Sequence, residues 1–178
     1  FVGGFFTGQS MIQSFAKGNG PNATVMLAPE SYGDITLVNI NETGPLKIMK
    51  SCYLASSDDV DINITTQSFS QSIFSGGVAI MNAVGKGIVA IHGSGGIDKI
   101  RIRPGDKIKV DNGNLVAWDN NVNYEIEKAA SGYFTSWASG EGVMCAFTGD
   151  GYVYMQSRQP IYDMVMSLIR QHCPRKRN

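Results

Sequence analysis

Short stretches in which apolar and polar residues alternate recur along this chain of 178 residues. Residues 60–64 and 122–126 alternate strictly, and a period of two places their apolar side chains on one face of an extended strand. Residues 35–40 carry apolar side chains at both odd and even positions, which predicts a strand buried on both faces. Glycine-rich segments separate these stretches, so the pattern predicts many short β-strands.

Three Gly-x-Gly segments stand between such stretches and predict hairpin turns, because glycine adopts the backbone angles that tight turns require. They are residues 18–20, 85–87 and 149–151. Residues 11–16 and 24–28 flank the first segment, and apolar stretches flank the other two in the same way. We therefore expect three β-hairpins, one at each segment.

The second and third hairpins belong to a longer internal repeat. Val60 corresponds to Val122, an offset of 122 − 60 = 62, and Gly85 corresponds to Gly149, an offset of 149 − 85 = 64. The two extra residues fall between the matched parts, where a surface loop tolerates insertion. Residues 7–27 follow the same order of glycine and apolar positions, which indicates a third, amino-terminal copy.

The copies predict a single compact all-β body over residues 1–159. We expect it to consist of three interleaved units, at about 1–50, 51–114 and 115–159. Only the end of the chain has a helical period, because the apolar residues after Pro160 recur on one helical face. The pattern therefore predicts a short C-terminal helix over residues 160–173 and a basic tail over residues 174–178.

Composition favours a protein that associates with copies of itself. The chain has 15 basic and 15 acidic residues, a formal net charge of 15 − 15 = 0, which argues against indiscriminate binding of nucleic acid. Charged residues make up only 17% of the chain, a low share for a soluble monomer. We therefore expect other subunits to cover part of the surface.

Cysteine usage points to a reducing, intracellular compartment. Cys52, Cys145 and Cys173 are odd in number and far apart, so the sequence predicts no disulfide framework. No apolar run is long enough for a membrane-spanning helix. The chain opens at Phe1 rather than at a methionine, so we expect an amino-terminal segment to precede it.

A basic stripe is the strongest candidate for a binding site. Period two places its members on the outer faces of two consecutive predicted strands, where they could contact phosphates. The members are Lys99, Arg101, Arg103, Lys107 and Lys109. An ordinary solvated strand face explains the same pattern, and no aromatic residue interleaves the stripe for base stacking.

Other motifs have simple structural explanations. The Gly-x-Gly of residues 85–87 resembles part of a dinucleotide fingerprint, but apolar β-type residues follow it where that fingerprint needs a helix. His92 and Ser94 are too close in sequence for a nucleophile and its base, and a glycine-rich turn explains them. His172 and Cys173 are neighbours that point apart on a helix, so their spacing supports no metal site.

The paired acidic residues Asp58 and Asp59, with Glu141, are candidates for acid–base chemistry. Asp58 and Asp59 align with Asn120 and Asn121 in the later copy, and turns favour both residue types. A turn is therefore the better interpretation, and the sequence predicts neither an enzyme, nor a metal site, nor a cofactor.

Several motifs stand in a fixed order along the chain. They are Leu27-Ala28-Pro29, Gly33-Asp34-Ile35, residues 110–118, Val122-Asn123-Tyr124-Glu125-Ile126, Ser139-Gly140-Glu141-Gly142, Phe147-Thr148-Gly149 and residues 153–158. These motifs are similar to those of a known family, named for altered inheritance of mitochondria in its eukaryotic members and as a domain of unknown function in bacteria. The resemblance covers Phe5 to Arg158.

The resemblance implies a fold like that of the tryptophan RNA-binding attenuation protein, with three β-sandwich units per chain related to the double-stranded β-helix. It also implies that chains join as trimers into a ring, and that more sequence precedes the position of Phe1. Eukaryotic members are linked with mitochondrial inner-membrane organisation, and the family has no established chemistry. We see no residues that match the attenuation protein's tryptophan pocket.

These observations favour a non-enzymatic scaffold that forms a homo-oligomer. The first alternative is binding of RNA or another polyanion through the basic stripe. The second is binding of a small ligand in a β-barrel pocket. The basic tail could make a peripheral membrane contact, although three charges are too few to anchor the chain alone. We expect a cytoplasmic location if the protein is bacterial and a mitochondrial one if it is eukaryotic.

Overall fold

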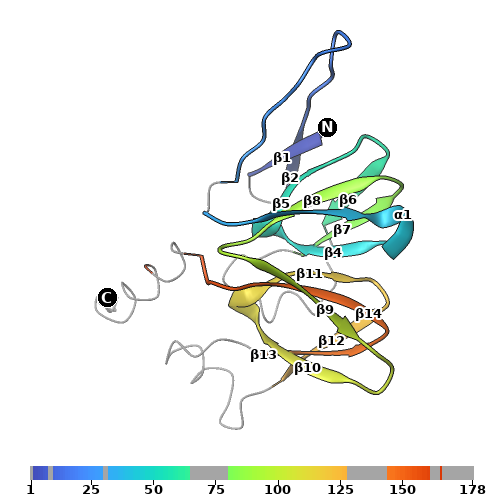
Figure 1. Ribbon diagram of the computed structural model, residues 1–178, viewed down its shortest axis with the longest axis vertical. Coiled ribbons are helices and arrows are strands. Elements are labelled where there is room, and N and C mark those ends of the chain that lie inside the picture. The colour runs from blue at the N-terminus through green and yellow to red at the C-terminus, as the bar shows by residue number, and fades with distance from the viewer. Residues whose placement is uncertain are drawn as a thin grey trace.

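The described part of the chain forms an all-β body of three antiparallel sheets (Figure 1). The computed structural model describes residues 2–7, 10–29, 32–64, 80–127, 144–160 and 165. The predicted C-terminal helix and basic tail, together with Glu141, His172 and Cys173, lie outside the described residues apart from Pro160 and Val165. Among the described residues, no helix is long and apolar enough to cross a membrane.

The five-stranded sheet has the order β2-β1-β5-β8-β3 and lies in the upper part of Figure 1. Its strands are β1 (Val2–Thr7), β2 (Ser10–Phe15), β3 (Ile35–Asn39), β5 (Tyr53–Ser56) and β8 (Ile88–His92). The three-stranded sheet at the lower end has the order β10-β13-β12. Its strands are β10 (Lys107–Asp111), β12 (Val122–Glu127) and β13 (Met144–Gly149).

The six-stranded sheet, in the order β6-β7-β4-β11-β14-β9, spans both halves. Its strands are β4 (Leu46–Met49), β6 (Val60–Ile64), β7 (Ile80–Gly85), β9 (Ile97–Ile102), β11 (Leu115–Asp119) and β14 (Gly151–Gln156). Antiparallel pairing of β4 with β11 joins the halves at the middle of this sheet. The described ranges of the body also contain three short helical turns: α1 (Ile40–Thr43), η1 (Lys50–Cys52) and η2 (Asn112–Asn114).

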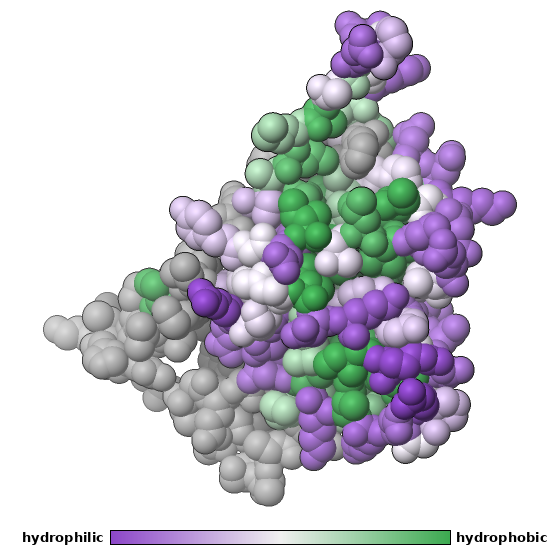
Figure 2. All heavy atoms as spheres, viewed as in Figure 1, coloured by the Kyte–Doolittle hydropathy of each residue, from purple (hydrophilic) through white to green (hydrophobic). Residues whose placement is uncertain are grey.

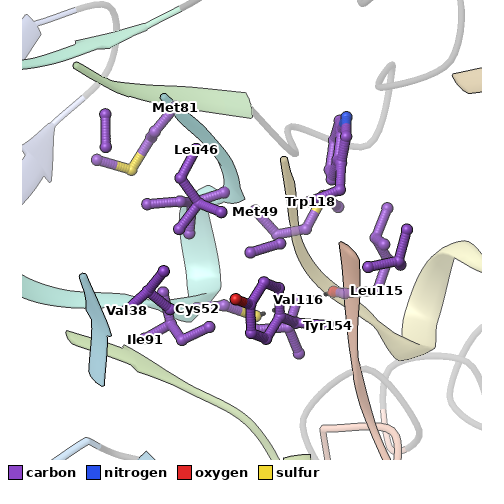
Figure 3. Packing of buried hydrophobic residues seen from close by; sticks show 14 of the residues in the cluster. Val38, Leu46, Met49, Cys52, Met81, Ile91, Leu115, Val116, Trp118 and Tyr154 are labelled. Carbon is purple, nitrogen blue, oxygen red and sulfur yellow. Dashed lines mark hydrogen bonds between the residues drawn. The ribbon is translucent and has the colours of Figure 1, made fainter. Parts of the chain in front are cut away.

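One apolar core runs through all three sheets. Figure 3 shows Leu46 and Met81 of the six-stranded sheet in the same cluster as Val38 and Ile91 of the five-stranded sheet. In the lower half, the fully buried Trp118 meets the rings of Tyr124 at 5.0 Å and Phe147 at 5.7 Å, both edge-on. These contacts close the six-stranded sheet over the three-stranded one, because edge-on aromatic pairs and apolar burial both stabilise such packing.

The β7–β8 and β13–β14 hairpins have matching geometry. The β5–β8 ladder shifts register between Tyr53 and Ala55, and the β11–β14 ladder shifts between Leu115 and Ala117. Val60 pairs with Gly85, and Val122 pairs with Gly149. Residues separated by offsets of 62 and 64 thus occupy matching places in these two parts of the chain.

The amino-terminal part differs from the prediction. Residues 11–15 do lie in a strand, β2, but its partner is β1, and residues 24–28 are not in a strand. The hairpin expected at residues 18–20 is therefore wrong. Pro21 and Pro29 bracket the returning segment, and a residue without an N–H group cannot donate to a ladder.

The burial predicted for both faces of residues 35–40 is wrong for one face of β3. Val38 is buried against the core, whereas Ile35 is 45% exposed and Leu37 is 64% exposed. The reason is that only one face of the sheet meets the core: Ile88 of the neighbouring strand β8 is also exposed on the side of Ile35 and Leu37, and no described layer covers that side.

The two hairpin glycines provide a test of the turn geometry. Gly85 and Gly149 have positive φ angles of 112° and 119°, and a Cβ atom at each would lie 2.3 Å and 2.7 Å from the carbonyl oxygens of Asp59 and Asn121. We expect Gly85→Ala and Gly149→Ala each to lower the free energy of unfolding by more than about 2 kcal/mol, measured by urea denaturation.

Gly105→Ala is the matched control for this substitution. Gly105 also has a positive φ angle, 95°, but a Cβ atom there would meet nothing within 4 Å. We expect Gly105→Ala to lower the free energy of unfolding by about 1 kcal/mol, the cost of the backbone conformation alone. If all three substitutions lowered the free energy of unfolding equally, the close approach of a backbone carbonyl oxygen to Gly85 and to Gly149 would be contradicted.

Candidate functional site

The structure divides the predicted basic stripe between two faces of the body. Lys99, Arg101 and Arg103 are exposed on or just after β9, at the edge of the six-stranded sheet. Lys107 and Lys109 lie on β10, in the three-stranded sheet. The strands' buried residues, such as Ile102 and Val110, share the core between these sheets, so the exposed residues point to opposite sides.

The β9 part of the stripe lies beside aromatic residues of β14. Tyr152 pairs with Arg101 across the strands, and Tyr154 pairs with Lys99. The Lys99 Nζ atom lies 4.0 Å from the centre of the Tyr152 ring, and the Arg101 guanidinium carbon lies 5.1 Å from it. The stripe therefore has an aromatic neighbour that the sequence of β9 does not reveal, because the register between β9 and β14 supplies it.

Arg101 is occupied by the β13–β14 turn. Its Nη1 atom donates to the carbonyl oxygen of Gly151 at 2.9 Å and to that of Ile102, and its Nη2 atom forms an ion pair with Asp150. Both partners of the pair are substantially exposed, so the ion pair itself adds little stability. The arrangement leaves Lys99 and Arg103 as the exposed cations of this face that could contact a polyanion.

Asp119 lies behind these cations at the end of β11 and is 4% exposed. Its Oδ2 atom accepts a hydrogen bond from the Tyr152 N–H at 2.8 Å, and its Oδ1 atom has no partner among the described residues. Burial raises the pKa of Asp119, and the Tyr152 N–H and the nearby Lys99 and Arg101 oppose that rise. Ser57 occupies the matching place in the other hairpin, where its hydroxyl accepts from the Ile88 N–H at 2.8 Å.

The glycine-rich loop after His92 is tied by hydrogen bonds to other parts of the body. Ser94 is buried, and its N–H donates to Oε1 of Gln156 at 2.8 Å. The Nε2 atom of Gln156 donates to the carbonyl oxygen of Gly113 at 2.7 Å, so one buried amide ties this loop to η2. This bonding gives the loop a structural role.

The remaining candidates lie in turns or in the core. Residues 85–87 form the tip between β7 and β8, with no helix after them. Asp58 and Asp59 are exposed in the turn between β5 and β6. Within the described ranges, no group of three or more His, Cys, Asp or Glu side chains could hold a metal ion. Burial raises the pKa of the Cys52 and Cys145 thiols to about 11, which keeps both protonated at neutral pH.

Comparison with known proteins places this geometry in a family. The family model described as "Mitochondrial biogenesis AIM24" matches residues 1–158. The chain belongs to the AIM24 family. An uncharacterized protein of Streptococcus pyogenes serotype M6 is 29% identical over 153 residues, which are 85% of this chain and 60% of that protein.

A crystal structure of another Streptococcus pyogenes protein, solved by structural genomics, shares the fold. The similarity has a TM-score of 0.66 at 26% sequence identity and covers 82% of this chain and 62% of that one. This AIM24 chain therefore spans about three fifths of the length of both relatives.

Asp119 provides a test of the site's electrostatics. Because burial raises its pKa, the folded protein holds the proton more tightly than the unfolded chain, and the stability that this group contributes falls as pH rises through that pKa. Asparagine keeps an acceptor for the Tyr152 N–H without a buried charge. We expect Asp119→Asn to be at least as stable as the parent at pH 7.

Asp119→Ala is the control, because it leaves the Tyr152 N–H without an acceptor. We expect it to lose about 1–3 kcal/mol of unfolding free energy in urea denaturation. If Asp119→Asn strongly lowered the free energy of unfolding at pH 7, the result would show instead that the charged carboxylate stabilises the fold.

Proposed function

We propose that this AIM24-family protein is a non-enzymatic scaffold, composed of three attenuation-protein-like β units, that works by assembling with copies of itself. The matching geometry of the β7–β8 and β13–β14 hairpins supports two of these units. A fold of like units offers several similar edges and faces for assembly.

The bonding of the polar residues supports a role without catalysis. Four polar side chains form hydrogen bonds to backbone groups of a neighbouring strand or turn: those of Ser57, Arg101, Asp119 and Gln156. These hydrogen bonds hold the hairpins together. An active site instead brings a nucleophile, a base and an oxyanion donor to one point.

The family's description supports a role in mitochondrial biogenesis for its eukaryotic members. We infer that such a scaffold acts inside the cell, in the mitochondrion of a eukaryote or the cytoplasm of a bacterium. Scaffolding of a larger complex or of a membrane surface is compatible with this description and requires no turnover. The ring of three chains that the resemblance implies is one closed form of the assembly.

Assembly is tested directly by light scattering coupled to gel filtration. We expect the parent protein at tens of micromolar to show a molar mass of two or more chains of 19.2 kDa, and we expect this mass to fall on dilution. A strict monomer over the whole concentration range would contradict the proposed function.

The second candidate, polyanion binding, is favoured by one observation: Tyr152 beside Lys99 on an exposed strand face. Cations next to an aromatic ring fit single-stranded nucleic acid. If this face binds RNA, changing Lys99 and Arg103 to Glu should abolish salt-sensitive binding of a single-stranded oligonucleotide, measured by fluorescence anisotropy. The matched control is Lys107→Glu with Lys109→Glu on the opposite face, and an equal loss there would contradict a specific site.

A further inference from the structure

One part of the surface carries exposed aliphatic residues on adjacent strands. Ile35 and Leu37 lie two residues apart on β3 and therefore on the same face. Ile88 on β8 pairs with Asn39, which places Ile88 diagonally next to Leu37 on that face. Their exposed fractions are 45%, 64% and 47%, and Figure 2 shows green atoms gathered over β3 and β8. We call Ile35, Leu37 and Ile88 the β3 patch.

The patch lies at an open sheet edge. Among the described strands β3 has a single neighbour, β8, and ends the five-stranded sheet. An edge strand presents backbone N–H and C=O groups that can pair with another strand. All five residues of β3, Ile-Thr-Leu-Val-Asn, are uncharged.

The matching edge in the other half of the molecule is charged. The pairing of β9 with β14 corresponds to that of β3 with β8, so Lys99 occupies the place of Leu37 and Arg101 that of Asn39. β9 also carries Asp98. Charges of this kind discourage edge-to-edge pairing. Of these two equivalent edges, only β3 lacks such protection.

We propose, resting on the self-assembly proposed above, that β3 is a subunit contact at which it pairs antiparallel with β3 of a second copy. Pairing centred on Leu37 sets Leu37 opposite its own copy and Ile35 opposite Asn39 of that copy, so the two β3 patches become one apolar surface. No charged residue of β3 faces another, and the net charge of zero adds no overall repulsion. The second copy is therefore the occupant that the charge pattern of this edge fits.

The geometry makes the contact two-fold. A contact in which the same strand pairs with itself closes after two copies, so it joins single chains or complete rings in pairs. The assembly therefore contains an even number of chains. Because two five-residue strands bury less than a standard interface of about 800 Å² per partner, the contact is reversible and concentration dependent.

The first test compares the full chain with Leu37→Lys by light scattering. The substitution gives β3 a lysine at the position that Lys99 occupies in β9. Because such a charge discourages edge-to-edge pairing, we expect the variant to have half the molar mass of the parent. Asn63→Lys is the matched control, because it adds the same charge at an exposed position of another edge strand, β6, and should leave the mass unchanged.

The second test asks whether Leu37 faces its own copy. In a Cys173→Ser background, Leu37→Cys should form a disulfide between two chains under mild oxidation, because directly paired residues bring their Cα atoms within disulfide reach. Cys52 and Cys145 are buried and do not compete. Asn63→Cys, the control, should stay monomeric on a non-reducing gel.

The outcomes separate this contact from the proposed function. A parent with an odd number of chains, or one whose mass Leu37→Lys leaves unchanged, overturns the β3 contact but leaves assembly intact. A parent that is monomeric at every concentration overturns both. Association of the monomer with vesicles of anionic lipid, lost in Leu37→Lys, would assign the β3 patch to a membrane surface and overturn the second copy as its occupant.

Discussion

The pairing of β4 with β11 is the contact on which the rest of the structure depends. Ile48 pairs with Ala117 there, and Leu46 pairs with Asp119. This ladder runs between the two matching hairpin systems and makes them share one six-stranded sheet and one core. Without it the six-stranded sheet would split into two three-stranded parts, and the buried residues Ile48 and Ala117 would lie at newly open sheet edges.

Sharing a core constrains where polar groups can sit. Where a turn meets the body, a single side chain bonds to backbone groups: the partly buried Ser57 and the buried Asp119 at the two hairpins, and the buried Gln156 between two loops. These bonds satisfy donors that burial would otherwise leave unpaired. They use the polar chemistry of the interior for structure, which leaves the exposed edges and faces as the surfaces through which the protein can act.

Much of the fold is predictable from the chain alone, because it depends on local pattern. The alternation of residues 60–64 and the offsets of 62 and 64 locate strands and hairpins correctly. What depends on distant neighbours is not predictable in this way. Leu37 lies in a stretch with the composition of a buried strand, yet the face of β3 that carries it is exposed. Tyr152 meets Lys99 only through the register of two strands. The solitary carboxylate Asp119 resembles any turn residue. Period two defines faces, but it does not say which face another layer covers.

The two halves form one cooperative body around the paired strands β4 and β11. Hydrogen–deuterium exchange followed by mass spectrometry under native conditions tests it most directly. We predict that the slowest-exchanging amides in peptides from β4, β11 and both hairpins lose their protection together, at the free energy of global unfolding. If one half exchanged through a separate opening of much lower free energy while the other stayed protected, the shared core would not be what holds this fold together.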